Sequence, residues 1–226
     1  MLDENSTGES PTLADAAARR LRGEILAGSL APAERLRLRA LSQRFGIGAT
    51  PLREALARLA AEGFVVAEGQ RGFSVPPITR AHLADITASR QVAEAEALRL
   101  AMRHGDAGWE DGIVAALALL RAEVKRRRAD SEWLDTYEAK HHAFHRALIA
   151  ACPWPSLRGF CDELYMQKTR YRRVLKGATR NWAAMLREHE ELARLVLARA
   201  PQPAVAALHR HIGATADAVL RLLAKG

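Results

Sequence analysis

The sequence predicts a mainly α-helical protein of two domains: a small N-terminal domain that ends in a strand hairpin, and a C-terminal six-helix antiparallel bundle. Alanine, leucine and arginine dominate the 226 residues and aromatic residues make up only 5%, which favours helices over a β-sandwich or barrel. Apolar residues recur at helical spacing along most of the chain. One short segment near residue 70 changes to strand-forming residues.

The first part of the chain predicts two helices. Residues 1–11 are polar and are expected to form a disordered tail. Thr12 is a candidate N-cap for a first helix that stops at Gly28, and the segment SLAPAERL is expected to be a loop. A short second helix is expected over about Leu38–Phe45, ending at Gly46.

A third helix is predicted within the segment GATPLREALARLAAEG. Thr50 is a candidate N-cap, and Pro51 suits the first helical position because that position needs no backbone donor. Gly63 is expected to end the helix. The next segment, FVVAEGQRGFSV, predicts two short strands around a turn, and the pair Pro76–Pro77 then indicates a stiff linker.

Every periodic segment after this linker has a helical pattern. The six expected helices cover about residues 80–104, 110–128, 131–151, 156–176, 181–200 and 203–224. The domains are therefore expected at residues 12–76 and 81–226, with residues 77–80 as the linker.

Composition excludes membrane, secreted and fibrous proteins. No apolar run approaches the roughly 20 residues that cross a bilayer, and the N-terminus MLDENSTGES has no apolar core of a signal peptide. Two cysteines, Cys152 and Cys161, cannot form a disulfide framework, so we expect a cytoplasmic protein. The net charge of +8 suits a polyanion, but charge alone does not identify one.

Three helices followed by a hairpin predict a winged helix-turn-helix, which presents one helix to the major groove of DNA. Arg39 and Arg53 would flank the groove, and the Thr50 hydroxyl at a helix N-terminus suits a phosphate. Arg71 beside Gly72 at the hairpin tip could approach the DNA backbone or minor groove closely. Two alternatives stay open: ordinary surface arginines, and a winged helix that contacts only proteins.

Histidine placement is the most informative feature of the second domain. His141 and His145 are four residues apart, so they share one helical face, and His189 and His211 lie on later helices. Imidazoles that converge from three helices would suit Zn²⁺, Ni²⁺ or another borderline divalent ion. A surface or core role without metal is the alternative, and it is the one expected for the remaining histidines, His82, His104, His142 and His209.

Three segments of the first domain resemble the DNA-binding domain of the GntR family of bacterial transcription regulators. They are AGSLAPAERL, LSQRFGIGATPLREALARLAAEGFV and GQRGFSV, within about residues 12–76. The resemblance implies that operator DNA is contacted by Arg39, Thr50, Arg53, Arg71 and Gly72. Gly48 and Ala49 stand where family members often carry Ser-Arg, so the half-site sequence cannot be carried over.

The second domain resembles the FCD effector domain of the FadR-type branch. The segments are DITASRQVAEAEALRLA, HHAFHRAL, EHEELARLV and HRHI. In metal-containing members an Asp and three His bind the ion. His145, His189 and His211 match the three histidine positions, whereas His141 stands at the Asp position. A four-histidine site would be softer and less negative than the family form.

The resemblance also implies a ligand. An organic acid typically binds the metal in such domains and pairs with an arginine, for which Arg90 is the first candidate because guanidinium matches carboxylate geometry. We therefore expect a homodimeric, ligand-responsive regulator, most simply a repressor, that binds a palindromic operator and senses a small carboxylate. Two alternatives are a metal-free regulator that senses acyl-CoA or another bulky anion, and a histidine-metal hydrolase.

Overall fold

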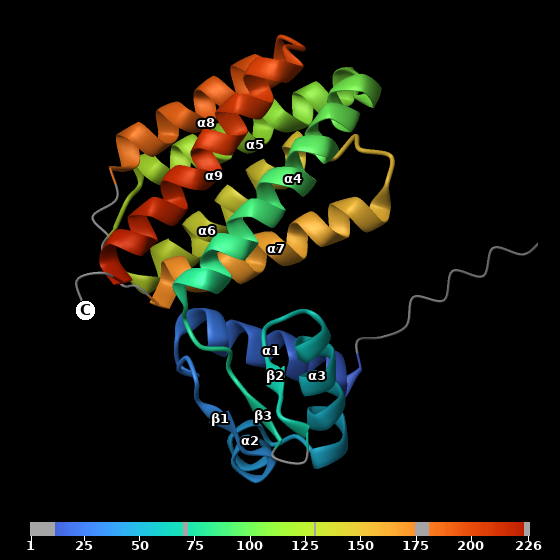
Figure 1. Ribbon diagram of the computed structural model, residues 1–226, viewed down its shortest axis with the longest axis vertical. Coiled ribbons are helices and arrows are strands. Elements are labelled where there is room, and N and C mark those ends of the chain that lie inside the picture. The colour runs from blue at the N-terminus through green and yellow to red at the C-terminus, as the bar shows by residue number, and fades with distance from the viewer. Residues whose placement is uncertain (1–11, 70–71, 129, 175–180, 224–226) are drawn as a thin grey trace, which may run out of the picture. The chain divides into compact units, whose positions relative to one another are not determined.

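The computed structural model describes residues 12–69, 72–128, 130–174 and 181–223. The chain divides into two compact units, residues 1–79 and 80–226, which are described separately (Figure 1). The predicted tail over residues 1–11 lies outside the described residues.

The N-terminal unit contains three helices and a small sheet. Its elements are α1 (Leu13–Ala27), β1 (Arg35–Leu36), α2 (Leu38–Phe45), α3 (Ala49–Ala61), β2 (Val66–Ala67) and β3 (Phe73–Ser74). Helices α1 and α3 pack together through fully buried side chains, among them Leu21, Ile25, Leu52, Leu56 and Leu59. This core leaves the polar faces of α2 and α3 on the surface.

Capping explains where α1 begins and ends. The Thr12 hydroxyl accepts a hydrogen bond from the Asp15 backbone N–H, and the Asp15 carboxylate accepts one from the Thr12 backbone. This capping box confirms Thr12 as the N-cap. At the other end Gly28 takes a left-handed conformation with φ of 77°, which an L side chain adopts only with strain.

The predicted N-cap of α3 is wrong. The helix begins at Ala49, with Gly48 in the extended cap position and no side-chain cap, so Thr50 lies inside the first turn. Pro51 is consequently the third residue of the helix, whereas the prediction placed it first. It is tolerated there because the first backbone N–H groups of a helix have no partner within the helix.

The sheet has one strand more than the sequence predicts. Strand β1 arises from the segment SLAPAERL, which was expected to be a loop, and the strand order is β1-β3-β2 with both pairs antiparallel. Arg35 pairs with Ser74 and Leu36 with Phe73. A two-residue strand is too short to show alternation, so β1 is defined only by its pairing with β3.

The C-terminal unit is a bundle of long helices. They are α4 (Arg80–His104), α5 (Ala107–Lys125), α6 (Ser131–Leu148), α7 (Pro155–Val174), α8 (Trp182–Leu197) and α9 (Pro201–Leu223). The predicted bounds of α4 are confirmed, so Arg80, assigned to the linker by the domain prediction, belongs to the helix. The predicted ends of two helices, Lys176 and Ala224, lie outside the described residues.

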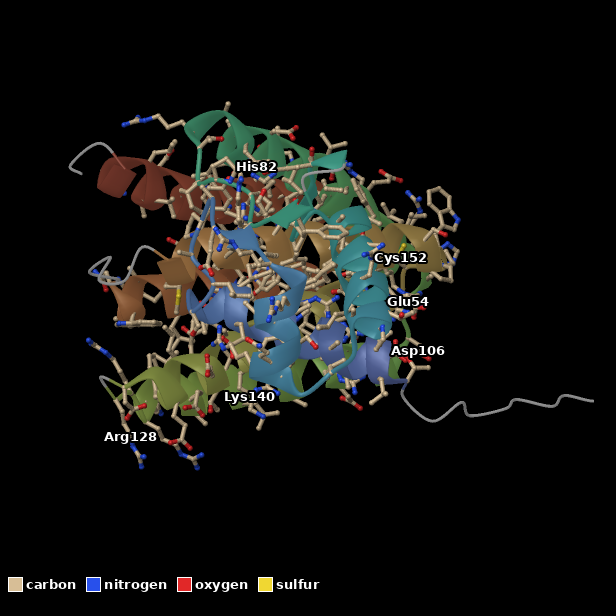
Figure 2. All side chains as sticks on the ribbon, turned by 90° about the horizontal axis from the view of Figure 1, so that it is seen from below. Glu54, His82, Asp106, Arg128, Lys140 and Cys152 are labelled. Atoms are coloured by element: carbon tan, nitrogen blue, oxygen red, sulfur yellow. The ribbon has the colours of Figure 1, made fainter. Side chains whose placement is uncertain are left out.

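Helix α4 packs against α7 and α9, α5 against α6 and α8, and α8 against α9 (Figure 1). The core between these helices is apolar over most of its length and contains Leu98, Ile113, Phe144, Leu192 and Leu208. Basic residues after α5 stay on the surface, and Figure 2 shows Arg128 directed outward. Among the described residues, no helix combines the length and apolarity that a membrane span needs.

Candidate functional site

Four buried histidines from three helices meet inside the bundle. His141 and His145 lie on consecutive turns of α6, His189 lies on α8 and His211 on α9, and none is more than 6% exposed. One ring nitrogen from each lies within 4.8 Å of the others. The i,i+4 spacing puts the first two on one face of α6, and the packing of α8 against α9 brings the other two beside each other.

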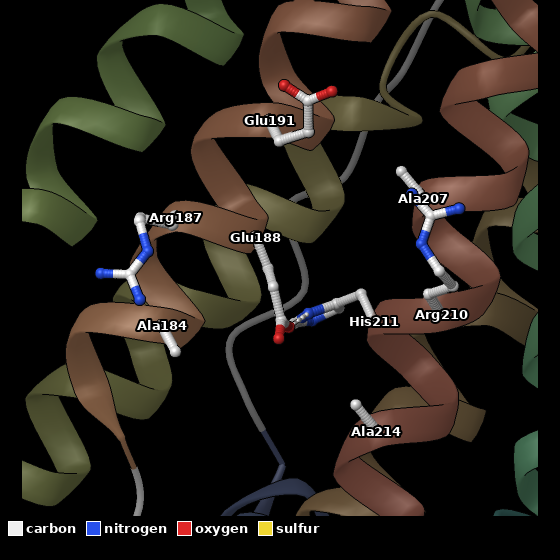
Figure 3. A pocket seen from close by; sticks show the side chains of 8 residues that line it. All are labelled: Ala184, Arg187, Glu188, Glu191, Ala207, Arg210, His211 and Ala214. Carbon is white, nitrogen blue, oxygen red and sulfur yellow. Dashed lines mark hydrogen bonds and ion pairs between the residues drawn. The ribbon is translucent and has the colours of Figure 1, made fainter.

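Hydrogen bonds at Nδ1 orient three of these rings. His189 Nδ1–H donates to the Met185 carbonyl at 2.6 Å, and His211 Nδ1–H donates to the Glu188 carboxylate at 2.9 Å (Figure 3). His141 Nδ1 is hydrogen-bonded to the Tyr165 hydroxyl. A hydrogen bond at Nδ1 leaves Nε2 as the coordinating nitrogen, which is how neighbouring groups usually hold metal-binding histidines.

The donor set fits a divalent transition metal. Imidazole nitrogens bind Zn²⁺ at about 2.0–2.1 Å, which places nitrogens on one ion roughly 3.0–3.5 Å apart. The candidate ligand atoms lie within 4.8 Å of one another, so the rings would move closer together to bind one ion. Neutral imidazole suits zinc, nickel and copper better than magnesium or calcium, so the cluster could hold an ion of the first group.

Arg90 is buried beside the cluster. Its Nε donates to the Glu94 carboxylate, and its guanidinium lies 4.9 Å from the centre of the Tyr165 ring. Glu94 reaches towards the cluster as well, since its Oε2 is 3.9 Å from Nδ1 of His145. Among the described residues, Nη2 of Arg90 has no hydrogen-bond partner. A buried guanidinium with an unsatisfied donor is suited to bind an anion.

The cysteines do not supply further ligands. Burial, and next to it the negative charge of Glu94, raises the pKa of the Cys161 thiol to about 12. Among the described residues, neither cysteine belongs to the group of candidate metal ligands that the four histidines form. Cys152 is also buried, and both cysteines are free thiols.

The other histidines have ordinary polar partners or lie on the surface. His82 Nδ1 is 2.6 Å from the Tyr171 hydroxyl, His142 Nε2 is 3.0 Å from Asp162, and His209 Nε2 is 3.0 Å from the Gln91 carbonyl. Burial, together with the nearby charge of Arg170, lowers the pKa of His82. His104 is exposed at the end of α4. These surroundings match the expectation that the four are surface or satisfied core residues.

Sequence reasoning missed the residues that support the cluster, namely Tyr165, Glu188 and Glu94. The Glu188 carboxylate accepts the His211 hydrogen bond. The four-residue spacing of Glu94 from Arg90 is a sequence signal that could have predicted the ion pair between them.

The residues predicted to contact DNA lie on α2, α3 and the hairpin of the N-terminal unit. Arg39 is exposed on α2, and Thr50 and Arg53 are exposed in the first turns of α3. Gly72 has φ of 95° and its carbonyl accepts a hydrogen bond from the Glu68 N–H, which closes the hairpin. Arg71 lies outside the described residues.

Ion pairing separates the arginines of this unit into two groups. Three are held by carboxylates of the unit itself: Arg22 by Glu62, Arg44 by Glu24 and Arg58 by Asp15. Within the described part of the chain, Arg39 and Arg53 form no ion pair. Their positive charge is therefore available to the phosphates of a nucleic acid.

A winged helix-turn-helix followed by a helical domain with a buried histidine cluster defines a class of ligand-binding transcription regulators. Residues 13–75 match the bacterial regulatory proteins of the gntR family, and residues 85–214 match the FCD domain. The chain belongs to the GntR family and carries an FCD domain.

Relatives and solved structures agree with this assignment. The uncharacterized HTH-type transcriptional regulator BphR of Paraburkholderia xenovorans (strain LB400) is 34% identical over 209 residues, covering 92% of this chain and 85% of BphR. The HTH-type transcriptional repressor GlaR of Escherichia coli (strain K12) is 32% identical over 196 residues, covering 85% of this chain and 89% of GlaR. The structure of E. coli McbR/YncC has the same fold, with a TM-score of 0.75 at 20% identity over 93% of this chain and 98% of that one.

Regulators of this family bind operator DNA through the winged helix and small-molecule effectors through the FCD domain. The chain is therefore a transcriptional regulator and not an enzyme, and the hydrolase alternative is wrong.

Proposed function

We propose that the protein is a homodimeric repressor whose FCD domain binds Zn²⁺ or Ni²⁺ and senses a small carboxylate. The observation that carries this proposal is the meeting of His141, His145, His189 and His211 with coordinating nitrogens within 4.8 Å. Neutral imidazole nitrogens gathered in a buried cluster are the donors that a divalent transition metal prefers.

The chain's own residues perform two tasks at this centre. Glu188, Tyr165 and the Met185 carbonyl fix the ring orientations through Nδ1. Arg90 offers the guanidinium Nη2 to the effector's carboxylate, and its other edge is held by Glu94. The bound ion would supply positive charge and open coordination positions for the same carboxylate. The neutral donor set leaves the full charge of the ion for this anion.

Operator recognition rests on the N-terminal unit. Arg39, Thr50 and Arg53 are exposed on α2 and α3, Gly72 belongs to the hairpin, and we expect Arg71, which the structure does not describe, to contribute as well. Two copies related by a two-fold axis would read a palindromic operator. Large apolar side chains on the bundle surface, such as Val92 on α4 at 73% exposed, support dimerisation through the FCD domain.

Effector binding would control operator binding, because the effector has a different affinity for each of two arrangements of the dimer. A ligand that binds one arrangement more tightly shifts the population towards it and changes the spacing of the two winged helices. The repressor role is supported by GlaR, a relative whose name describes a transcriptional repressor. The effector would then release the operator.

Elemental analysis of tag-free protein tests the metal centre. We expect about one Zn²⁺ or Ni²⁺ per chain, lost in the double variant His145→Ala/His189→Ala. His104→Ala is the matched control, because His104 is exposed and should leave the metal content unchanged. Circular dichroism of each variant separates loss of metal from loss of fold.

A protein that holds no metal, and takes up none from added Zn²⁺ or Ni²⁺, would contradict the metal-dependent mechanism. The regulator would then recognise its effector without metal, and acyl-CoA or another bulky anion becomes the class to test. Operator binding is measured separately, by titrating the apo and metal-loaded protein into labelled DNA in the presence and absence of a small carboxylate.

A further inference from the structure

The positive charge of the N-terminal unit is concentrated in one stretch of the chain. Between Glu34 and Glu54 the sequence contains no aspartate or glutamate and five arginines, namely Arg35, Arg37, Arg39, Arg44 and Arg53. The stretch includes β1, α2 and the beginning of α3. Because clustered arginines are the usual partners of nucleic-acid phosphates, the DNA-binding surface is expected to extend beyond the residues predicted to contact DNA.

The short strand β1 determines the direction of two of these arginine side chains. Successive side chains of a strand point to opposite faces of the sheet. Leu36 is buried in the core at 4% exposed, whereas Arg35 and Arg37 on either side of it are exposed. The backbone of Arg37 is still extended, with φ of −80° and ψ of 113°, before α2 begins at the next residue. Both arginines therefore lie on the solvent side of β1.

The register of the sheet brings Arg37 close to the hairpin. Leu36 of β1 pairs with Phe73 of β3 in antiparallel register. One residue further along, the same register sets Arg37 opposite Gly72, where the hairpin turn ends. The Arg37 carbonyl also accepts a hydrogen bond at 3.0 Å from the Leu41 N–H of α2. Arg37 is thus a residue at which the hairpin and α2 adjoin.

The side chain of Arg37 is not engaged by other groups of the unit. It makes no hydrogen bond that caps α2, and it forms no ion pair within the part of the chain that the structure describes. Two carboxylates belong to the surroundings of β1, and both accept hydrogen bonds from elsewhere. Glu34 accepts from the Ala31 N–H at 2.7 Å, and Glu68 accepts from the Ser74 hydroxyl at 2.6 Å. The guanidinium of Arg37 is therefore available to an anion outside the unit.

Helix-turn-helix geometry indicates where such an anion would lie. The second helix of the motif, here α3, lies in the major groove, and the first helix, here α2, crosses the phosphate backbone. The hairpin is expected to approach the adjacent minor groove. One phosphate backbone separates these two grooves. A residue between α2 and the hairpin consequently faces this backbone when both elements contact DNA.

We propose that Arg37 binds a backbone phosphate between the major groove that receives α3 and the minor groove that the hairpin approaches. The contact does not depend on base sequence, because a guanidinium on a phosphate positions the protein without reading base edges. This inference rests on the proposed operator binding, and it adds a residue outside the predicted DNA contacts.

The test measures DNA affinity between about 50 and 200 mM salt by fluorescence anisotropy of labelled duplexes. One duplex is selected by the wild-type protein from a random library, and the other has the same length and an unrelated sequence. Arg37→Ala removes the charge and Arg37→Lys keeps it. Arg19→Ala is the matched control, because Arg19 is exposed on α1 and also forms no ion pair among the described residues. Circular dichroism checks that each variant is folded.

We expect Arg37→Ala to weaken binding to both duplexes by the same factor. The slope of log affinity against log salt should become shallower by about one, because one phosphate contact is lost. The loss of affinity should therefore shrink roughly three- to fourfold between the lowest and the highest salt. Arg37→Lys and Arg19→Ala should keep the wild-type slope.

Three results would overturn the inference and leave the proposed operator binding in place. They are an unchanged slope in Arg37→Ala, a loss confined to the selected duplex, and an equal change of slope in Arg19→Ala. The second result would assign Arg37 to base reading, and the third would reduce its effect to the general charge of the unit. If the library yields no duplex that the wild-type protein binds, the proposed operator binding itself fails, and the inference fails with it.

Discussion

The Nδ1 atom of His211 lies 2.9 Å from a carboxylate oxygen of Glu188, a residue of the neighbouring helix α8. Glu188 is adjacent in sequence to His189, so one turn of α8 supplies both a cluster histidine and the group that orients a second one. Burial raises the pKa of the Glu188 carboxyl, although the positive charge of a protonated His189 would act in the opposite direction. The pair ties α8 to α9 at the edge of the candidate metal centre.

Removal of this carboxylate should weaken metal binding. We expect Glu188→Ala to lower the affinity for Zn²⁺ by about 10–100-fold, because the His211 ring loses the acceptor that fixes its tautomer and orientation. Competition with a chromophoric chelator measures the affinity. Glu191→Ala is the matched control, since Glu191 lines the same groove between α8 and α9 as Glu188 (Figure 3) but pairs with Arg194. Equal losses in the two variants would show that only the general charge of the groove matters.

Substitution of His141 should change which metal is preferred. Asp is the residue that the FCD pattern places here, and a carboxylate is a harder donor than imidazole. We expect His141→Asp to raise the affinity for Mn²⁺ relative to Zn²⁺ and Ni²⁺, and to weaken acetate binding because the site gains one negative charge. Metal content after equilibration with an equimolar mixture of the three ions measures the preference. An unchanged preference would mean that His141 does not contact the ion.

Sequence patterns within one segment predict the helices of this protein, but they cannot predict contacts between segments that are far apart in the sequence. The bounds of α4 and the Thr12 cap depend on residues that are close in sequence, so hydrophobic periodicity and capping rules predict them. The spacing of His141 and His145 likewise places both on one face of α6. Strand β1 was not predicted, because its two residues form a strand only by pairing with β3, almost forty positions later in the sequence.

The same reason limits the prediction of the candidate site. Tyr165 approaches His141 from α7, and Glu94 approaches His145 from α4. Such contacts depend on how helices pack, which the period of a single helix does not reveal. The role of the four histidines as metal ligands stays a prediction.

Arg53 should contribute to DNA affinity through its charge. It is exposed on α3 and forms no ion pair among the described residues. We expect Arg53→Ala to weaken binding to a duplex selected by the wild-type protein from a random library. If the contact is to a phosphate, the slope of log affinity against log salt should fall by about one. Arg121→Ala, on the bundle surface, provides the control and should change neither quantity.

The capping box of α1 should make the stability of the N-terminal unit depend on pH. Hydrogen bonds from Thr12, with the charge of Arg58, lower the pKa of Asp15 from 3.8 to about 2. Because the folded pKa is the lower one, ionised Asp15 stabilises the fold above about pH 4, and this contribution is lost as pH falls towards 2. Asp15→Asn should therefore unfold at lower urea than wild type at pH 6, with a smaller difference at pH 2.5. The exposed Asp111→Asn variant should match wild type at both pH values.

The buried pair of Arg90 and Glu94 allows effector binding to be separated from stability. Their side chains are 3% and 6% exposed, so removing one partner leaves an uncompensated buried charge, which costs about 3–5 kcal/mol. We expect Arg90→Met to lower the free energy of unfolding by an amount of this order, and Arg90→Met/Glu94→Leu to recover most of it because apolar side chains replace both charges.

Acetate binding to the Zn²⁺-loaded protein should behave differently from stability. It should be weakened in Arg90→Met and should remain weak in the stable double variant, because neither retains a guanidinium to pair with the carboxylate. Urea unfolding and calorimetric titration of the same preparations give the two quantities. Recovery of acetate binding in the double variant would show that Arg90 acts only through the fold, and that the carboxylate is held by other groups.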